Sequence, residues 1–443
     1  MSNSPLHPSS FILHTSPSPP LRGTAVLPGD KSISHRAILF AALAEGESCA
    51  ENLLVSGVTR AMLDALTTLS VPWQLDGTTL TVQGCGLRNW PTPTQPIHCG
   101  NSATTMRLLA GALAASGVTA VLDGSSGLRR RPMTRIVNPL QQMGVNISAS
   151  EGCAPLMLGQ SDFPLTAVQY NLPIASAQVK SCLLLAGLAA AGPITLTEPG
   201  PSRDHTERML RAMGVQVDMP HSGQVILHPP TVPLHPLQIT IPGDISSAAF
   251  LIVAALIVPG SQVMLHGVGL NPTRTGLLDA LRQMGARIAI SDAAEVGGEP
   301  VGDLTITADE LHGTEVGGDL VVRMIDEFPA FAVAAALAEG QTVVRDATEL
   351  RHKESDRITA LCRELQAIGA DVTETADGFI INGQPRLPGG TVNPHGDHRL
   401  AMSLAVAGLA SAQGVTVQNA EITHESFPAF AEMLAGLGAE IGD

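Results

Sequence analysis

The chain has 443 residues, of which 44% are hydrophobic and only 15% charged, and its formal net charge at pH 7 is −15. This composition excludes an intrinsically disordered chain and is sufficient for a large core in two or more domains. The negative charge argues against a broad nucleic-acid-binding surface, which needs an excess of Lys and Arg. A local cationic pocket remains compatible with it.

The N-terminal 20 residues contain no Lys or Arg and are rich in Ser and Pro. We therefore expect a flexible tail over residues 1–20 and no signal peptide. The longest apolar run, residues 248–258, is too short to cross a bilayer, so no membrane partner is expected. The six cysteines show no C-x-x-C pair and no metal-ligand spacing, which predicts free thiols and a cytoplasmic protein.

The first predicted helix begins in LPGDKSISHRAILFAALAEG, residues 27–46. From Ala37 onward the segment is apolar on all sides, which is typical of a fully buried helix. Charged and hydroxyl side chains nevertheless crowd its start, including Lys31, Ser32 and Arg36. The sequence thus places polar chemistry at the entrance to a buried helix.

Two helix types then alternate along the chain. One is amphipathic, ends at Gly and leads directly into a strand; its copies are residues 139–150, 209–219, 280–290, 364–374 and 432–441, with a weaker copy at 64–75. The other is apolar, rich in Ala and usually followed by a short strand, as in MRLLAGALAASG and AAFLIVAALIVPG. The pattern predicts six copies of a unit about seventy residues long. An alternative, six helical hairpins in a solenoid, is disfavoured by the intervening strands.

The six copies group into two sets of three, because PGDKSIS at residue 28 and PGDISSA at residue 242 are similar openings. We expect an α/β protein of two similar domains, residues 29–241 and residues 242–443 together with residues 21–28. The hinges should lie near residues 28–30 and 241–244. Short polar residues should cap the buried helices: Ser32, Asn101, Ser176, Asp244 or Ser246, Asp326 and Asp397.

Basic residues lie at these same helix starts. The chain has only three lysines, and the set at or near helix starts is Lys31, Lys180, Lys353, Arg36, Arg107, Arg203, Arg357 and Arg399, with Arg131 ending the run LRRR. Each alone is explicable as a surface ion pair, but together with the positive helix ends they predict a site for a multiply charged anion. Asp326 and Glu354 join this layer either as acid–base catalysts or as counter-charges. GDHR at residues 396–399 lacks metal-ligand geometry, so no metal is expected.

Taken together, eight motifs resemble the enolpyruvyl transferase family. They are PGDKSISHRA, GNSATTMR, RRRP, ASAQVKS, SRDHTE, IDE, RHKESDR and GDHR, and they span residues 28–399 in the family order. The resemblance implies two similar domains, each of three βαβαββ repeats around buried parallel helices. It also implies a carboxyvinyl transferase that moves the enolpyruvyl group of phosphoenolpyruvate to the 5-hydroxyl of shikimate 3-phosphate and releases phosphate, a step of the shikimate pathway. No metal or organic cofactor is implied.

The resemblance also implies roles for individual residues, carried over by motif. The contacts to shikimate 3-phosphate would be Lys31, Ser32, Arg36, Ser176, Ala177, Gln178, Arg203, Asp326 and Lys353. The contacts to phosphoenolpyruvate would be Lys31, Asn101, Ala103, Thr104, Arg131, Gln178, Arg357 and Arg399. The catalytic groups would be Lys31, Asp326 and Glu354, with Asp326 acting on the acceptor hydroxyl and Glu354 protonating the methylene carbon.

The chain departs from the common family pattern at three places. Ala103 stands where many members have Gly, and its methyl group would crowd glyphosate, so we expect weak inhibition and a resemblance to the glyphosate-tolerant branch. Gly57 and Val58 supply no carboxylate after Ser56, and Glu425 replaces a Lys found in some members. The roles of those family residues therefore do not transfer to this chain.

Two other functions remain open. A sister enzyme uses UDP-N-acetylglucosamine as acceptor, but its reactive Cys is missing from residues 125–133 here. A non-catalytic anion-binding protein would need the arginines but not Asp326 and Glu354 together. No sequence feature indicates an oligomer, and a monomer is expected.

Overall fold

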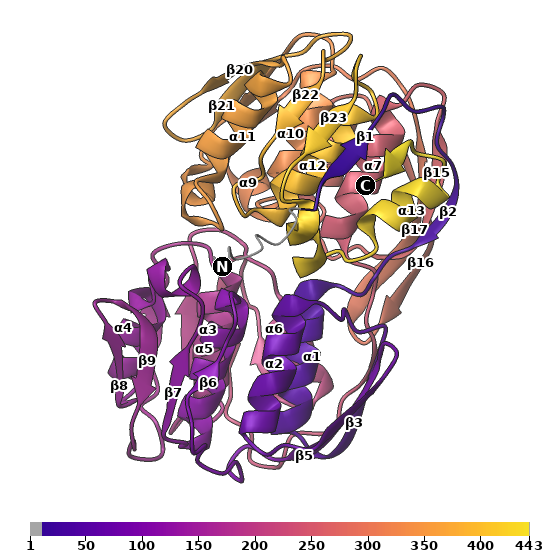
Figure 1. The fold of residues 1–443 in the computed structure, drawn as a ribbon. Helices are drawn as coiled ribbons and strands as arrows, with labels where there is room; N and C mark the ends of the chain where they lie inside the picture. The colour runs from indigo at the N-terminus through magenta and orange to yellow at the C-terminus, as the bar shows by residue number, and fades with distance from the viewer. Residues whose placement is uncertain (1–10, 443) are drawn as a thin grey trace, which may run out of the picture.

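The computed structural model of the protein describes residues 11–442, which form two lobes. In Figure 1 the indigo-to-magenta lobe lies below and the orange-to-yellow lobe above. The strands of the described residues form six four-stranded sheets, three in each lobe. None of the helices in residues 11–442 is long and apolar enough to span a membrane.

One repeat shows the plan of all six. The strand order is β6-β7-β9-β8; β6 and β7 are parallel, and the other neighbours are antiparallel. Its elements are β6 (Ile97–His98), α3 (Ala103–Ser116), β7 (Ala120–Asp123), η1 (Leu128–Arg130), α4 (Thr134–Gln142), β8 (Ile147–Ser150) and β9 (Cys153–Leu158). The predicted βαβαββ unit is therefore present.

Two further repeats complete the N-terminal lobe, with the same order of parallel and antiparallel pairs. The first has β14 (Gln238–Thr240), α1 (Lys31–Leu43), β3 (Glu45–Glu51), α2 (Gly57–Thr68), β4 (Trp73–Asp76) and β5 (Thr79–Cys85). The third has β10 (Gln169–Asn171), α5 (Ala177–Gly187), β11 (Ile194–Thr197), α6 (His205–Ala212), β12 (Val217–Asp218) and β13 (Gln224–Leu227).

The C-terminal lobe repeats the plan three times. The fourth repeat has β2 (Arg22–Val26), α7 (Ile245–Ile257), β15 (Gln262–Gly269), α8 (Gly276–Gln283), β16 (Arg287–Val296) and β17 (Glu299–Thr307). The fifth has β18 (Glu315–Val316), α9 (Asp319–Arg323), α10 (Phe328–Ala336), β19 (Gln341–Val344), η2 (Thr348–His352), α11 (Arg357–Ala367), β20 (Asp371–Glu374) and β21 (Phe379–Asn382). The sixth has β22 (Gly390–Val392), α12 (His398–Gly408), β23 (Val415–Val417), η3 (Ala420–Glu425), α13 (Phe430–Gly436), β24 (Ile441–Gly442) and β1 (Leu13–Thr15).

Three strands come from distant parts of the chain. β14 completes the sheet of the first repeat, while β2 and β1 complete sheets in the C-terminal lobe. Figure 1 shows this for β1, an indigo strand among yellow ones. The expected flexible tail over residues 1–20 is therefore wrong for residues 13–15, which pair with β23, residues 14 and 15 also pairing with β24. Residues 1–10 of that prediction lie outside the described residues.

Each lobe has its own hydrophobic core around its three apolar helices. One core is made of residues between 33 and 241, and the other of residues 13–27 and 245–439. All residues of α7 are buried, as its apolar sequence predicts. In the N-terminal lobe α3 packs so closely on α5 that a Cβ on Gly111 would clash with the carbonyl oxygen of Cys182. We propose that the two cores are separate domains.

The chain crosses between the cores at two adjacent places. Residues Gly29 and Gly243 form an antiparallel bridge, and the backbone N–H of Asp30 donates to the carbonyl of Pro242 at 2.8 Å. In the reverse direction, the backbone N–H of Asp244 donates to the carbonyl of Pro28 at 3.0 Å. These crossings lie at the predicted hinges, and we propose that the lobes rotate about them.

The predicted helix ends are confirmed, whereas half of the predicted N-caps are wrong. The glycines that end the amphipathic helices all have φ between 83° and 96°: Gly144, Gly214, Gly285, Gly369 and Gly438. Ser176, Asp244 and Asp397 cap their helices as predicted. Asp30, Ser102 and Glu327, however, take the cap positions expected of Ser32, Asn101 and Asp326. The reason is that each of these three starts holds several polar residues, and tertiary contacts decide where the helix begins.

Candidate active site

A cavity of about 280 Å³ lies between the lobes. We call it the cleft. Fifteen of the sixteen site residues predicted from the sequence line it, and they come from both lobes: Lys31, Ser32, Arg36, Asn101, Ala103, Thr104, Arg131, Ser176, Ala177, Gln178, Arg203, Asp326, Lys353, Glu354 and Arg399. Arg357 is fully buried behind this wall.

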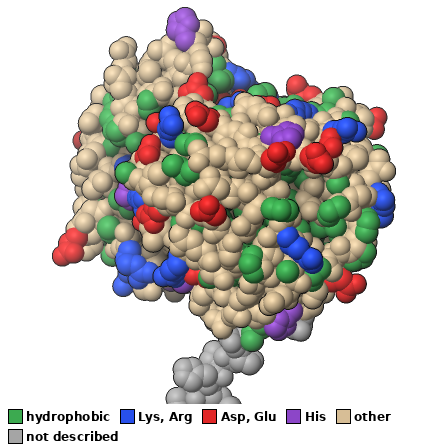
Figure 2. Space-filling model, turned by 90° about the horizontal axis from the view of Figure 1, so that it is seen from above, with side chains coloured by type: hydrophobic (Ala, Val, Ile, Leu, Met, Phe, Trp, Pro, Cys, Tyr) green, Lys and Arg blue, Asp and Glu red, His purple; other side chains and the backbone are tan. Residues whose placement is uncertain are grey.

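Helix N-termini point positive charge into the cleft. Residues at the starts of α1, α3, α5 and α12 line it, and helix starts present free N–H groups and a partial positive charge. Lysine and arginine side chains add to this field in a chain of net charge −15. Outside the cleft the charges mix: the face in Figure 2 shows acidic and basic side chains interspersed. The cleft therefore gathers positive charge locally on an acidic protein.

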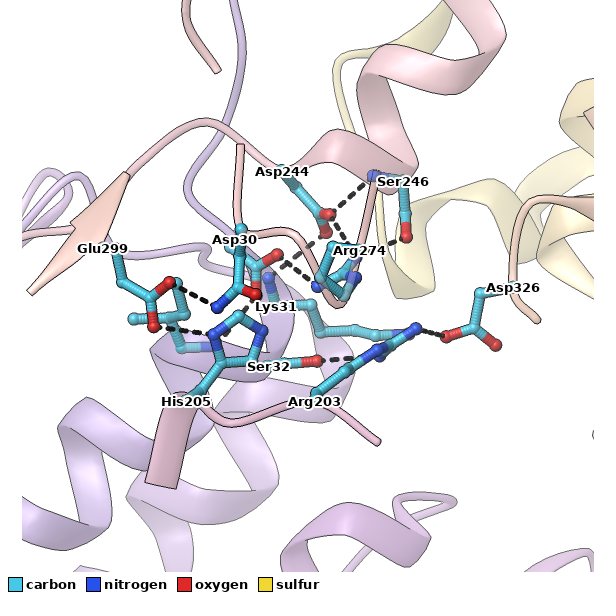
Figure 3. Close-up of polar contacts among 12 residues, drawn as sticks. Asp30, Lys31, Ser32, Arg203, His205, Asp244, Ser246, Arg274, Glu299 and Asp326 are labelled. Carbon is cyan, nitrogen blue, oxygen red and sulfur yellow. Dashed lines mark hydrogen bonds and ion pairs between the residues drawn. The ribbon is translucent and has the colours of Figure 1, made fainter. Parts of the chain in front are cut away.

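Asp326 lies among cations from both lobes. Its Oδ2 is 2.5 Å from Nη2 of Arg203 (Figure 3). The same oxygen is 3.7 Å from Nη2 of Arg399, and Oδ1 is 3.6 Å from Nη1 of Arg357. Burial disfavours the charged carboxylate, but these cations and Lys353 outweigh it and hold the pKa of Asp326 well below its usual range. Asp326 is thus a carboxylate, pointed at the cleft and able to accept a hydrogen bond.

Glu354 is the second carboxylate of the cleft. Its Oε2 is 2.6 Å from Nη2 of Arg357, and its Oε1 is 3.4 Å from Nη2 of Arg131 in the other lobe. Burial opposes the charge here too, yet the two arginines hold the pKa of Glu354 well below its usual range. Arg357 is fixed in turn by Asp397, the cap of α12, at 2.8 Å.

Lys31 extends into the cleft from the first residue of α1. Burial lowers its pKa, the charge of Arg399 lowers it further, and Asp326 and Glu354 act in the opposite direction. Burial likewise lowers the pKa of Lys353. These ammonium groups therefore release a proton more readily than exposed lysines do.

The N-terminal lobe supplies a hydrogen-bonded wall. Gln178 donates to Thr104 Oγ1 at 2.9 Å and accepts from Arg107 at 2.5 Å, while Arg203 donates to Ser32 Oγ at 3.2 Å. Arg36 is held by the side chains of Thr206 and Ser181 and by the carbonyl of Ser32. Hydrogen bonds thus hold the polar side chains of this wall against one another.

Lys180 does not line the cleft, contrary to its grouping with the anion-binding residues. It is buried, with Nζ 2.7 Å from Glu198 and 2.9 Å from Glu207. The sequence placed it correctly near a helix start, but its ammonium group is occupied by two buried carboxylates.

Other cleft residues were missed by sequence reasoning. Arg135 and Glu349 pair across the lobes at 2.9 Å, and both line the cleft. His398 lines it as well, and burial together with Lys31 and Arg399 holds its pKa well below 6.5. Only the GDHR motif gave a signal for His398. Within residues 11–442 there is no group of three His, Cys, Asp or Glu residues placed to hold a metal ion.

Comparison with known proteins gives the family. A family model described as EPSP synthase (3-phosphoshikimate 1-carboxyvinyltransferase) matches residues 15–434. The chain belongs to the EPSP synthase family. It is an enzyme that transfers carboxyvinyl groups, a class of alkyl-group transferase, and the enolpyruvyl transferase resemblance is confirmed.

Similar proteins cover nearly the whole chain. The 3-phosphoshikimate 1-carboxyvinyltransferase of Geobacter sulfurreducens is 49% identical over 95% of this chain and 98% of its own length. That of Desulforudis audaxviator is 47% identical over 97% of this chain and 100% of its own length. The structure of EPSP synthase from Acinetobacter baumannii superposes with a TM-score of 0.87 at 41% identity, covering 98% of this chain and 99% of that one. The predicted fold class is confirmed.

A more distant structure shares the fold alone. The enolpyruvyl transferase NikO from Streptomyces tendae has a TM-score of 0.80 at 20% identity, over 98% of this chain and 99% of that one. The two-lobed architecture is thus common to enzymes whose sequences have diverged widely.

Proposed function

We propose that the enzyme transfers the enolpyruvyl group of phosphoenolpyruvate to the 5-hydroxyl of shikimate 3-phosphate and releases phosphate, within the shikimate pathway to aromatic amino acids. One observation carries this most directly: Asp326 and Glu354 face a cationic cleft between two lobes, beside Lys31. An anion-binding protein needs the cations but has no use for two carboxylates in the same cleft. The names of the relatives support the choice of substrates.

Asp326 is proposed to act on the acceptor. Its carboxylate accepts the proton of the 5-hydroxyl as the oxygen attacks C2 of phosphoenolpyruvate. Ser32, Ser176, Gln178, Arg203 and Lys353 hold shikimate 3-phosphate in position, with Arg36 and Ala177 in the same wall. The short contact of Asp326 with Arg203 supports this role because it ties the base to a residue proposed to bind the acceptor.

Glu354 and Lys31 are proposed to act on phosphoenolpyruvate. A proton is added at the C3 methylene while C2 is attacked, which gives a tetrahedral intermediate. Loss of a proton from C3 and cleavage of the C2–O bond then release phosphate and restore the double bond. Glu354 is ionised in the free protein, so it must first take up a proton. An anionic substrate bound by Arg131, Arg357 and Arg399 competes with Glu354 for Arg131 and Arg357, and this raises the pKa of Glu354.

Tolerance to glyphosate is part of the proposal. Ala103 is buried at the first position of α3 and lines the cleft beside Asn101 and Thr104, which we assign to phosphoenolpyruvate. Its methyl group fills space that a bulkier inhibitor needs. We also propose a cytoplasmic monomer; the six cysteines, all unpaired, support the reducing compartment.

The test is phosphate release from phosphoenolpyruvate, run with shikimate 3-phosphate and in parallel with UDP-N-acetylglucosamine. Release with shikimate 3-phosphate alone is the expected result. Phosphate release with UDP-N-acetylglucosamine would contradict the assignment of shikimate 3-phosphate as the acceptor. Light scattering after gel filtration measures the oligomeric state in the same preparation.

A further inference from the structure

One loop of the C-terminal lobe reaches the N-terminal lobe with two buried polar side chains. This segment, residues 270–275 between β15 and α8, is called the hinge loop. Asn271 and Arg274 are each 2% exposed, and neither lines the cleft. A buried Arg and a buried Asn need partners, and both find them across the lobe boundary.

Arg274 joins the starts of three buried helices. Its Nη1 is 2.7 Å from Asp30 Oδ2, and its Nη2 is 2.8 Å from Ser246 Oγ and 3.3 Å from Asp244 Oδ1 (Figure 3). Glu327, the residue after Asp326, lies 3.9 Å from Nη2. One guanidinium therefore balances carboxylates at the starts of α1, α7 and α10.

The contact with Asp30 bears directly on Lys31. Asp30 caps α1 by accepting from the N–H of Ile33 at 2.9 Å. The N–H of Lys31 donates to Asp244, the other partner of Arg274, at 3.2 Å. The backbone of Lys31 is thus held between two carboxylates that Arg274 fixes.

Asn271 makes the corresponding connection to Arg203. Its Nδ2 donates to Asp204 Oδ1 at 2.6 Å and to Glu299 Oε2 at 2.9 Å. Glu299 Oε1 lies 2.7 Å from Nδ1 of His205, the first residue of α6 (Figure 3). The residues that follow Arg203 are therefore anchored to the opposite lobe.

We propose that the hinge loop positions residues of the acceptor site. Arg274 fixes the position of Lys31, and Asn271 fixes that of Arg203, relative to Asp326 of the C-terminal lobe. The two residues do not touch substrate and act through Asp30 and Asp204. This inference rests on the proposed function, because it takes Lys31 and Arg203 as contacts to shikimate 3-phosphate. The hinge loop, which lies outside the cleft, would thus control how far Lys31 and Arg203 lie from Asp326.

The test compares Asn271→Ala, Arg274→Lys and Arg274→Gln with wild-type enzyme. A misplacement of about 1 Å can cost up to about 100-fold in rate. We expect kcat/KM for shikimate 3-phosphate to fall roughly tenfold or more, mainly through KM, and KM for phosphoenolpyruvate to change less than about threefold. Arg274→Lys should retain more than Arg274→Gln because it keeps the charge. Arg282→Gln on α8 is the matched control; its side chain is more exposed and pairs only within its own lobe.

Thermal unfolding of each variant separates positioning from stability. A folded Asn271→Ala enzyme whose KM for shikimate 3-phosphate stays within twofold of wild type overturns the proposal, even if its melting temperature is lowered. Should Arg274→Gln not fold, Asn271→Ala and Arg274→Lys carry the decision. If wild-type enzyme does not turn over, the proposed function fails instead, and calorimetric binding of shikimate 3-phosphate to the same variants still tests the positioning.

Discussion

Ala103 contributes a single methyl group to the wall of the cleft, at the first residue of α3. Ala103→Gly removes it and enlarges the space beside the proposed phosphoenolpyruvate contacts. We expect the inhibition constant for glyphosate to fall about tenfold or more, the equivalent of about 1.4 kcal/mol, with a smaller change in KM for phosphoenolpyruvate. Inhibition assays at fixed shikimate 3-phosphate measure both. Ala177→Gly, the same deletion at the first residue of α5, should alter inhibition much less.

An unchanged inhibition constant in Ala103→Gly would show that the methyl group does not restrict glyphosate. The proposed tolerance would then need another cause in the cleft.

Glu354 allows a sharper separation of binding from chemistry. Glu354→Gln keeps the shape of the side chain but removes the carboxylate that we assign to proton transfer. General acid–base groups typically contribute 10²- to 10⁴-fold, so we expect kcat to fall by at least about 100-fold. Binding of phosphoenolpyruvate in the presence of shikimate 3-phosphate, measured by calorimetry, should weaken far less. Loss of binding together with a normal kcat would contradict the assignment.

The matched control for Glu354→Gln is Glu421→Gln. Glu421 is an exposed residue of η3, the short helix that ends at the cleft residue Glu425. We expect it to leave kcat within about twofold, because surface substitutions away from special features usually have small effects.

At the residue scale, the sequence predicted the residues that line the cleft but not the residues behind them that hold them in place. Lys31 and Asp326 stand just before apolar helices, and Glu354 stands in the charged run RHKESDR, so a local pattern could find them. Asn271 and Glu299 have no such signal, since their importance comes from a contact between lobes. Which two surfaces meet across a hinge is set by the packing of whole lobes.

At the scale of elements, each apolar helix had to begin with groups that satisfy its first N–H donors. The sequence therefore predicted where helices start to within a few residues. It could not choose between adjacent caps such as Ser32 and Asp30. Asp30 takes the position because Arg274 stabilises its carboxylate there, and that arginine is far away in the chain.

The buried start of α1 also predicts a pH effect on stability. His35 Nδ1 lies 2.8 Å from the carbonyl oxygen of Lys31, and Nε2 lies 3.1 Å from that of Val58 and 3.2 Å from Ser102 Oγ. Hydrogen bonds to these carbonyls favour the protonated ring, but burial outweighs them. Burial, with Lys31 and Arg36 nearby, lowers its pKa from 6.5 to about 4. Between pH 6.5 and pH 4, His35 is protonated in the unfolded chain but neutral in the folded one. Its contribution to the free energy of unfolding is therefore fully present above pH 6.5 and is lost as the pH falls toward 4. The loss from this group is about 3 kcal/mol by pH 4.

Urea unfolding at several pH values between 4.5 and 7.5 measures this loss. His35→Gln, which cannot take up the proton, should have a shallower dependence of unfolding free energy on pH than wild type. His14→Gln, at an exposed position of β1, should keep the wild-type slope. Equal slopes for wild type and His35→Gln would show that His35 is not the group responsible.

At the scale of the whole molecule, internal repetition made the architecture predictable, and strand exchange limited the prediction. The six similar units followed from the glycine stops and the apolar helices, and their grouping into two sets followed from the similar openings PGDKSIS and PGDISSA. β1 escaped notice because it is three residues long and pairs with residues some 400 positions away. The sequence around a short strand does not indicate which distant strand it pairs with. The Ser- and Pro-rich composition around it was typical of a tail.

The two cores predict that the N-terminal lobe folds by itself. Residues 29–241 include β14, which completes the sheet of the first repeat, and a core that uses no residue of the other lobe. We expect this fragment to unfold cooperatively in urea with helical circular dichroism, although Asp30 and His205 lose their partners. A fragment of residues 29–236 lacks β14, leaves the edge of β3 open, and should lose stability or aggregate. If residues 29–241 show no cooperative transition, the lobes are not independent domains, and the crossings at residues 28–30 and 242–244 join one folding unit.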